Sequence, residues 1–218
     1  MTPRRTIAIV FAGLALVAGH PAWAHPHVFI DSRLRFEMRG AECVGIQVEW
    51  TFDPVFSADV IGQFDRNRDG LFDAAENESV RMKAFSNLRK YGYFTFIRKD
   101  DKRSCPETVE DFQASQRDGR ALYRFRIPLE SQGISGSFGV ASFDTTFYCA
   151  MRYAEEGAPI IWIGDEPEGK PRIEITPNKK YPVYYNPMGG AGDSRVYLKW
   201  EKGLQTAYPE EICLVFDE

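Results

Sequence analysis

The residues from Asp65 to Glu76 have the spacing of an EF-hand calcium loop. Such a loop carries its ligands at alternate positions, and glycine at its sixth position, here Gly70, allows a sharp turn. Ca²⁺ is a hard cation that binds about six to eight oxygen atoms, and this spacing offers an oxygen wherever one is required. The predicted calcium ligands are Asp65, Asn67, Asp69, the backbone carbonyl of Leu71, Asp73 and Glu76.

The flanking residues predict the helices that would position this loop. Asp53 followed by Pro54 is typical of a helix start, and apolar residues then recur at helical spacing as far as Phe64. A second apolar stripe follows the loop and stops at Gly92, a residue that often ends a helix. We therefore expect an EF-hand-like helix–loop–helix insert over about residues 54–92.

Two arginines bear on the strength of the calcium site. Arg66 and Arg68 occupy positions that supply no ligand, and their positive charge opposes cation binding. We therefore expect a weak site, with a dissociation constant on the order of 10⁻⁴–10⁻³ M, that acts as a structural staple rather than a sensor. The alternative is a turn rich in Asp and Asn that binds no metal.

The first residues are typical of a secretory signal peptide, which we place at residues 1–24. A basic start precedes an apolar run over residues 7–18, and Ala22-Trp23-Ala24 gives a small-residue cleavage site. That run is too short to span a bilayer, and no later stretch is long and apolar enough to do so. We therefore expect residues 25–218 to form a single periplasmic domain that is not integral to a membrane.

The net charge of the exported chain argues against some classes of binding partner. Removal of Arg4 and Arg5 with the signal peptide lowers the basic count from 27 to 25, against 31 acidic residues. The exported chain then has a net charge of about −6, which argues against nucleic acid and against anionic membrane surfaces as partners.

Cleavage after Ala24 would expose His25, followed by Pro26 and His27. Two imidazoles on alternate residues of an extended chain point to the same side, and they could bind Ni²⁺, Co²⁺, Cu²⁺ or Zn²⁺ together with the α-amine. Pro26 has no N–H, so a chelate built from successive backbone amides is excluded. The alternative is a polar chain end that binds nothing. Candidates for additional carboxylate ligands are Asp31, Asp53 and Asp144.

Four cysteines remain in the exported chain, and no two of them form a Cys-x-x-Cys motif. An even number in an exported protein favours disulfides, for which three connectivities exist. Our first choice pairs Cys43 with Cys105 and Cys149 with Cys213. The alternative is that they are buried free thiols.

The remaining pattern predicts a mainly β (α+β) fold. Apolar and polar residues alternate over residues 28–38 and 44–52, as in paired half-buried strands, and Asp118-Gly119 is a typical hairpin turn. We expect a β-sandwich-like domain that carries the helix–loop–helix insert. Further strands are expected near residues 93–97, 109–116, 122–127, 136–151, 196–200 and 212–216.

Several segments together resemble one bacterial family, a domain of unknown function described as the periplasmic component of uncharacterised ABC-type transport systems. The resemblance covers about residues 24–150, and we find no match after Ile160. Besides the calcium loop, the similar segments are Ala24-His25-Pro26-His27-Val28-Phe29-Ile30-Asp31, Trp50-Thr51-Phe52-Asp53, Lys90-Tyr91-Gly92-Tyr93-Phe94 and Phe143-Asp144-Thr145-Thr146-Phe147-Tyr148.

Members of this family often occur beside permeases of the nickel/cobalt exporter type. The resemblance therefore implies transition-metal handling, with His25 and His27 as ligands and an inner-membrane metal permease as partner. It implies no mechanism.

Two functions follow from these observations. The first is a periplasmic metal-binding accessory protein of a nickel/cobalt-type transport system with a structural calcium site, and the alternative is a calcium-stapled periplasmic interaction module without a transition-metal role. An enzyme is not expected, because a Ser or Cys nucleophile needs a base and the exported chain has histidines only at its start. The chain also lacks the βαβ alternation of two-lobed solute-binding proteins.

Overall fold

The computed structural model shows a mainly β protein, as the sequence predicts. It describes residues 26–129, 133–154, 160–164, 169–190 and 193–216. The predicted signal peptide and His25 lie outside these residues.

The larger sheet is built around the hairpin of β1 (Val28–Arg39) and β2 (Glu42–Phe52), which confirms the two strands predicted from alternation. Strands β6 and β5 extend the sheet beyond β2, while β9 and β10 pair in parallel with the two halves of β1 on the other side. The additional strands are β5 (Glu110–Arg117), β6 (Arg120–Pro128), β7 (Ile134–Ser135), β9 (Cys149–Tyr153) and β10 (Ile160–Trp162).

The predicted hairpin turn between β5 and β6 is confirmed. Asp118 and Gly119 both have positive φ angles, 53° and 72°, as a two-residue type I′ turn requires. This turn fixes the register in which Gln116 faces Ala121.

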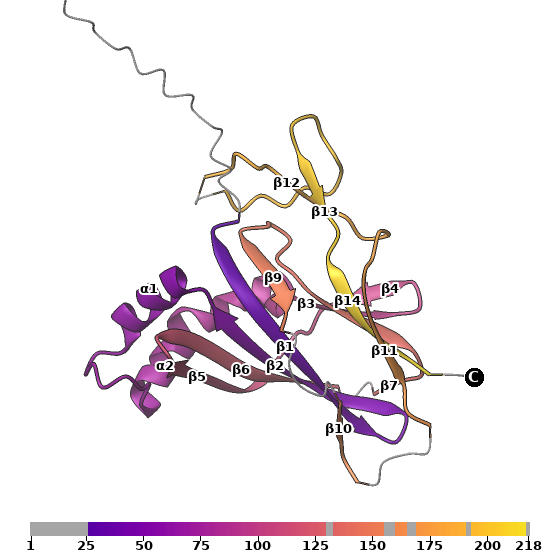
Figure 1. Cartoon of the computed structure of the whole chain (residues 1–218), viewed down its shortest axis with the longest axis horizontal. Coiled ribbons are helices and arrows are strands. Elements are labelled where there is room, and N and C mark those ends of the chain that lie inside the picture. The colour runs from indigo at the N-terminus through magenta and orange to yellow at the C-terminus, as the bar shows by residue number, and fades with distance from the viewer. Residues whose placement is uncertain (1–25, 130–132, 155–159, 165–168, 191–192, 217–218) are drawn as a thin grey trace, which may run out of the picture.

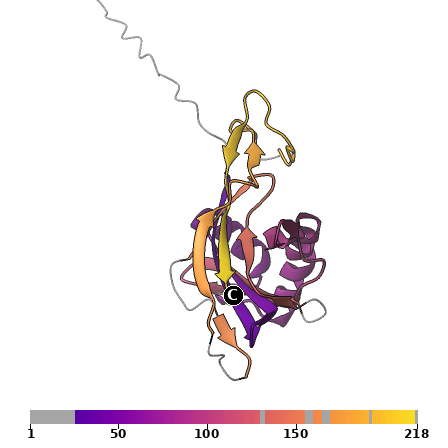
Figure 2. The same ribbon diagram turned by 90° about the vertical axis from the view of Figure 1, so that its right-hand side faces the viewer.

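A second sheet packs against the larger one, so the fold is sandwich-like. Phe36 of β1 meets Phe138 of β8 edge-on, with 5.8 Å between ring centroids, and residues of both sheets share one buried core. A short ribbon of β12 and β13 projects beyond these sheets (Figure 1 and Figure 2). The strands are β3 (Thr95–Lys99), β4 (Lys102–Ser104), β8 (Phe138–Ser142), β11 (Arg172–Pro177), β14 (Glu210–Val215), β12 (Val183–Tyr185) and β13 (Gln205–Ala207).

The helices lie beside β5 and β6 at one end of the larger sheet (Figure 1). They are α1 (Pro54–Phe64), α2 (Ala74–Lys83) and the 3₁₀ segment η1 (Phe85–Phe94). A helix–loop–helix is therefore present where the sequence predicts one. No helix in the described part of the chain is long and apolar enough to cross a membrane.

The second helix is shorter than predicted. We expected it to continue to Gly92, but α2 gives way to η1 after Ala84. Ser86 and Asn87 donate side-chain hydrogen bonds to the carbonyls of Met82 and Lys83, at 2.8 and 3.0 Å. Such local bonds compete with regular helical hydrogen bonding, which explains why the apolar stripe overestimates the helix.

Two strand predictions also need correction. The segment from residue 136 to 151 forms β8 and β9, which belong to different sheets, rather than one strand. Residues 196–200 form no strand, since only Tyr197 makes a single bridge, to Tyr184. The alternating apolar residues there are exposed, and Leu198 is 92% exposed, so no second layer covers them within the described part of the chain.

All four cysteines lie in the described residues and are free thiols, so neither predicted disulfide is formed. Cys43 is buried in β2, and burial is the main cause that raises its pKa to about 12. Cys105 lies so close to Gly92 that a Cβ atom at position 92 would come within 2.5 Å of the Cys105 Cβ. Cys149 and Cys213 are in strands of different sheets.

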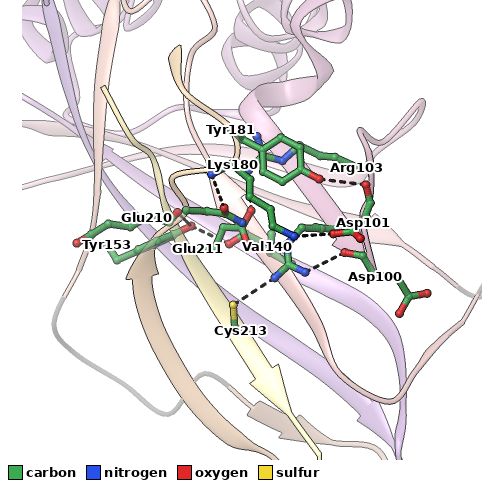
Figure 3. A network of polar contacts seen from close by, with 12 residues as sticks. Asp100, Asp101, Arg103, Val140, Tyr153, Lys180, Tyr181, Glu210, Glu211 and Cys213 are labelled. Carbon is green, nitrogen blue, oxygen red and sulfur yellow. Dashed lines mark hydrogen bonds and ion pairs between the residues drawn. The ribbon is translucent and has the colours of Figure 1, made fainter. Parts of the chain in front are cut away.

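A buried ion-pair network holds the second sheet together (Figure 3). Glu211 of β14 is 1% exposed and accepts hydrogen bonds from Arg98 Nε at 2.8 Å and Arg103 Nη2 at 2.6 Å. The Arg103 guanidinium also lies 3.8 Å from the ring centroid of Tyr181. Because both arginines come from the β3–β4 hairpin, the network ties that hairpin to β14 and to the turn that follows β11.

We expect Glu211→Ala to lower the free energy of unfolding by about 3–5 kcal/mol, because it leaves two partly buried guanidinium groups without a counter-charge. Urea denaturation followed by circular dichroism measures this. Glu174→Ala is the control, since Glu174 pairs with Arg172 on the surface and its loss should cost under about 1 kcal/mol. Equal losses in the two variants would contradict the structural role of the network.

The same network predicts acid sensitivity. Burial alone would raise the pKa of Glu211, but hydrogen bonds from Asn178, Arg103 and Arg98 outweigh it and hold the pKa below its usual value. The stabilisation is therefore fully present above the ordinary glutamate pKa of about 4.3 and is lost as the pH falls through the lower folded value. Glu211→Gln should remove this part of the pH dependence.

Candidate functional site

Asp65, the first predicted calcium ligand, is buried where α1 ends. Its side chain is 7% exposed, and Oδ2 accepts hydrogen bonds from the Gly70 N–H at 3.2 Å and Gln116 Nε2 at 2.9 Å. Within the described part of the chain, Oδ1 is buried and has no hydrogen-bond partner. A buried carboxylate oxygen without a donor is costly unless a cation binds it. One oxygen of Asp65 is therefore fixed by donors, and the other remains for a cation.

Asn67 and Asp69 shape the middle of the loop. Asn67 Oδ1 accepts from the Asp69 N–H at 3.0 Å, and Asp69 Oδ1 accepts from the Leu71 N–H at 2.9 Å. These two side-chain-to-backbone hydrogen bonds form tight local turns. Gly70 follows with a φ of 82°, a left-handed conformation that glycine adopts without steric cost. The sequence-predicted turn is therefore present at Gly70.

Asp73 and Glu76 join the loop to α2 as a capping box. Asp73 Oδ1 accepts from the N–H groups of Ala75 and Glu76, both at 2.8 Å, while Glu76 Oε2 accepts from the Asp73 N–H at 3.1 Å. Glu76 Oε1 also accepts from the Arg66 N–H at 2.7 Å. Glu76 is 6% exposed, and its buried carboxylate therefore links the last residue of the loop to the second.

The donor set of the loop consists of oxygen atoms, which fits Ca²⁺ and not a transition metal. In the described residues, no three His, Cys, Asp or Glu side chains converge as a ready metal site. The loop oxygens instead accept N–H groups, as described above. The unpartnered Oδ1 of Asp65 is the observation that favours a cation.

The environment of Asp65 keeps its carboxylate ionised. The hydrogen bond from Gln116 is the largest cause that lowers its pKa, burial acts in the opposite direction, and the N–H groups of Gly70, Arg68 and Asp69 add to the lowering. An ionised carboxylate is the form that binds a cation, so cation binding at neutral pH requires no proton release here.

The sequence did not identify Gln116 as a residue that contacts the predicted calcium loop. This residue lies in β5, far from the loop in sequence, and its Nε2 also donates to the Leu71 carbonyl at 3.2 Å. No local motif marks it, because its role depends on how β5 packs beside the helix–loop–helix.

His27, the second predicted transition-metal ligand, is not on a loose chain end. Its backbone N–H donates to the Tyr148 carbonyl at 2.9 Å, and its ring lies 5.0 Å from the Tyr148 ring, centroid to centroid. His27 is half-buried beside the start of β1. Its predicted partner His25 lies outside the described residues, so the pair of imidazoles is not seen together.

Asp31 and Asp53, two of the three carboxylates proposed to complete that site, have other partners. Asp31 forms ion pairs with Arg152 at 2.5 Å and Arg120 at 3.7 Å. Asp53 caps α1 and accepts from the Phe29 N–H at 2.8 Å. Burial alone would raise the pKa of Asp53, but its hydrogen bonds to N–H groups outweigh this and lower it.

Asp144, the third carboxylate, is 3% exposed. Its Oδ1 accepts from the Thr146 N–H and Oγ1, both at 2.8 Å, and its Oδ2 accepts from the Cys149 N–H at 3.1 Å. Cys149 faces Val28, the residue that follows His27, across the β1–β9 pairing. Burial raises the pKa of the Cys149 thiol far above its usual value, and the charges of Asp144 and Asp53 add to this.

His27, Asp53, Asp144 and Cys149 thus come to the same end of the larger sheet from separate parts of the chain. Sequence reasoning did not select Cys149 as a ligand, because its position depends on the parallel pairing of β9 with β1. A cavity of about 420 Å³ lies beside two of them. Asp144 and Cys149 line it, together with aromatic side chains that include Trp50, Phe52, Phe56, Tyr91, Phe94, Tyr123 and Tyr148.

The family model described as "Protein of unknown function (DUF1007)" matches residues 10–216. The chain belongs to this family. The match extends well beyond Ile160, so the expectation that the likeness stops there was wrong. The C-terminal strands are therefore part of the DUF1007 domain as well.

This DUF1007 protein is similar to proteins of Spirochaeta aurantia and Haemophilus influenzae. The "Uncharacterized 15.5 kDa protein in trpE 3'region" of Spirochaeta aurantia is 30% identical over 118 residues, which cover 54% of this chain and 84% of the relative. An "Uncharacterized protein" of Haemophilus influenzae is 25% identical over 149 residues, or 66% of this chain and 70% of the relative. These names carry no statement about activity or ligands.

The burial of the cysteines gives a prediction about their reactivity. Because Cys105 is exposed and the thiols of Cys43 and Cys149 are buried with raised pKa values, iodoacetamide at pH 8 should alkylate Cys105 first. Mass spectrometry of the folded, non-reduced protein measures this, and Cys105→Ser should remove the fast reaction. A mass four hydrogens lower, with no alkylation, would instead show the disulfides expected from the sequence.

Proposed function

We propose that this DUF1007 protein is a calcium-stapled periplasmic interaction module. The observation that carries the proposal is the buried Asp65 carboxylate, whose Oδ1 has no hydrogen-bond partner in the described residues, within a loop that matches the EF-hand pattern. A divalent cation would satisfy that oxygen and offset the repulsion among the loop carboxylates.

The position of the loop supports a structural role for the cation. The loop joins α1 to α2, and the two helices pack against β6 and β5 respectively. A cation held by residues at the end of α1 and the start of α2 would fix both helices to the sheet. Arg66 and Arg68 are exposed at positions that supply no ligand, which supports a weak, structural site.

Exposed apolar side chains support the interaction role. Several large apolar side chains face solvent in the connection between β12 and β13 and just after β13, and exposed apolar groups are typical of partner-binding surfaces. They are Met188, Val196, Leu198, Trp200 and Tyr208. The periplasmic location rests on the predicted signal peptide.

We expect Ca²⁺ at about 100 times its dissociation constant to stabilise the fold by about 2.7 kcal/mol, or roughly 5–10 °C in melting temperature. Thermal melts with Ca²⁺ and with chelator measure this, and Mg²⁺ at the same concentration controls for ionic strength. Glu76→Gln should abolish the difference between the two melts.

Asp59→Asn is the matched control, because Asp59 is an exposed carboxylate on α1 outside the loop. This variant should respond to Ca²⁺ like the wild type. For each variant, the melting temperature with Ca²⁺ is compared with the melting temperature of the same variant in chelator. This comparison is needed because Glu76 also caps α2, so its substitution can change stability without any cation. Identical melts of the wild type with Ca²⁺ and with chelator would reject the calcium staple.

A second candidate function is a periplasmic metal-binding accessory protein of a nickel/cobalt-type transport system. The observation that favours it is that the pairing of β9 with β1 brings Asp144 and Cys149 to the end of the sheet where His27 lies, although no three such side chains converge within the described residues. Imidazole and thiolate are ligands that Ni²⁺, Co²⁺, Cu²⁺ and Zn²⁺ accept, and His25 would add a further imidazole and the α-amine. Metal binding would release the proton that the raised pKa keeps on Cys149. An inner-membrane permease would be the partner.

Calorimetry on residues 25–218, with His25 as the first residue, tests this candidate. We expect transition-metal binding that weakens below about pH 6, as the imidazoles become protonated. The double variant His25→Ala with His27→Ala should lose this binding and keep its response to Ca²⁺. Unchanged binding of Ni²⁺, Co²⁺, Cu²⁺ and Zn²⁺ by the double variant would reject the histidine site and leave the calcium-stapled module.

A further inference from the structure

A side chain of the main sheet reaches the calcium loop. One nitrogen of Gln116, Nε2, lies 2.9 Å from Asp65 Oδ2 and 3.2 Å from the Leu71 carbonyl oxygen. These groups belong to loop positions one and seven, and both residues are predicted ligands. Gln116 is half-buried near the end of β5, next to the hairpin turn.

The orientation of the Gln116 amide follows from its neighbours. Both contacted atoms are acceptors, and the amide NH₂ group offers two hydrogens, so the nitrogen and not the oxygen must face them. A single NH₂ group therefore holds two separate parts of the loop at one point of the sheet. With Oδ2 of Asp65 held by Gln116 and by the Gly70 N–H, Oδ1 is the oxygen left without a donor.

We propose that Gln116 is a positioning residue of the cation site, which sets the affinity of the loop for Ca²⁺ by fixing Asp65 and the Leu71 carbonyl before the cation binds. This inference rests on the proposed calcium function. Strand β5 then contributes to the cation site through Gln116 without supplying a ligand. Partners that orient metal ligands in this way commonly change metal affinity by roughly 10- to 100-fold when they are removed.

Loss of Gln116 should not undock the helices. The Ala114 N–H of β5 donates to Asn77 Oδ1 of α2 at 3.4 Å, and the core residues Val80 and Phe85 pack independently of Gln116. A variant at position 116 should therefore fold and keep its melting temperature in chelator. The affinity for Ca²⁺ can then be separated from general stability.

Gln116→Met keeps the length and approximate volume of the side chain and removes its donors. We expect its dissociation constant for Ca²⁺ to rise roughly 10- to 100-fold in calorimetry, with an unchanged melting temperature in chelator. Gln113→Met is the matched control, because Gln113 is an exposed glutamine of the same strand that pairs with Arg124 and lies with Arg35 and Glu49. This control should bind Ca²⁺ like the wild type.

Gln116→Glu separates positioning from direct coordination. A glutamate cannot donate and would repel Asp65, so a positioning role predicts weaker binding. Tighter binding by Gln116→Glu would overturn the proposal in favour of a direct ligand, and an unchanged affinity of Gln116→Met would also overturn it. If the wild type itself binds no Ca²⁺, the proposed function fails, which is a distinct result.

Discussion

The carboxylate of Asp53 fixes how the strands and helices of this protein are joined. Its Oδ2 accepts from the Phe29 N–H, its own N–H donates to the Phe29 carbonyl, and its Oδ1 caps α1 through the N–H groups of Val55 and Phe56. The start of β1, the end of β2 and the start of α1 therefore meet at one side chain. Since the predicted calcium loop follows α1 and His27 precedes β1, both candidate sites are positioned relative to Asp53.

The two candidate sites differ in chemistry and in how they are built. The loop from Asp65 to Glu76 is local, its donors are oxygens, and only Gln116 comes from a distant strand. His27, Asp144 and Cys149 lie at the same end of the sheet only because β9 pairs with β1, and their side chains contain nitrogen and sulfur as well as oxygen. A hard cation would be selected by the first and a borderline transition metal by the second. The two proposed sites would therefore bind different classes of metal.

Local patterns predicted the local features of the fold. The alternation in β1 and β2, the Asp53-Pro54 helix start and the Asp118-Gly119 turn each depend on neighbouring residues, and each is present. Features that depend on distant packing were missed. Residues 196–200 alternate as a strand would but lack a second layer, and neither Gln116 nor Cys149 has a neighbour in sequence that marks its place. The sequence suggests a calcium loop because the candidate ligands follow one another, whereas the candidate ligands near His27 are scattered along the chain.

The parallel pairing of β1 has a consequence for folding. The hairpin of β1 and β2 can form as soon as its residues are available, but the opposite edge of β1 pairs with β9 and β10, which come far later in the chain. Until then, β1 presents an unpaired edge flanked by apolar side chains, which is a template for aggregation. This edge should therefore stay exposed until β9 and β10 have joined it, and substitutions that weaken β9 should lower the yield of folded protein before they alter either candidate site.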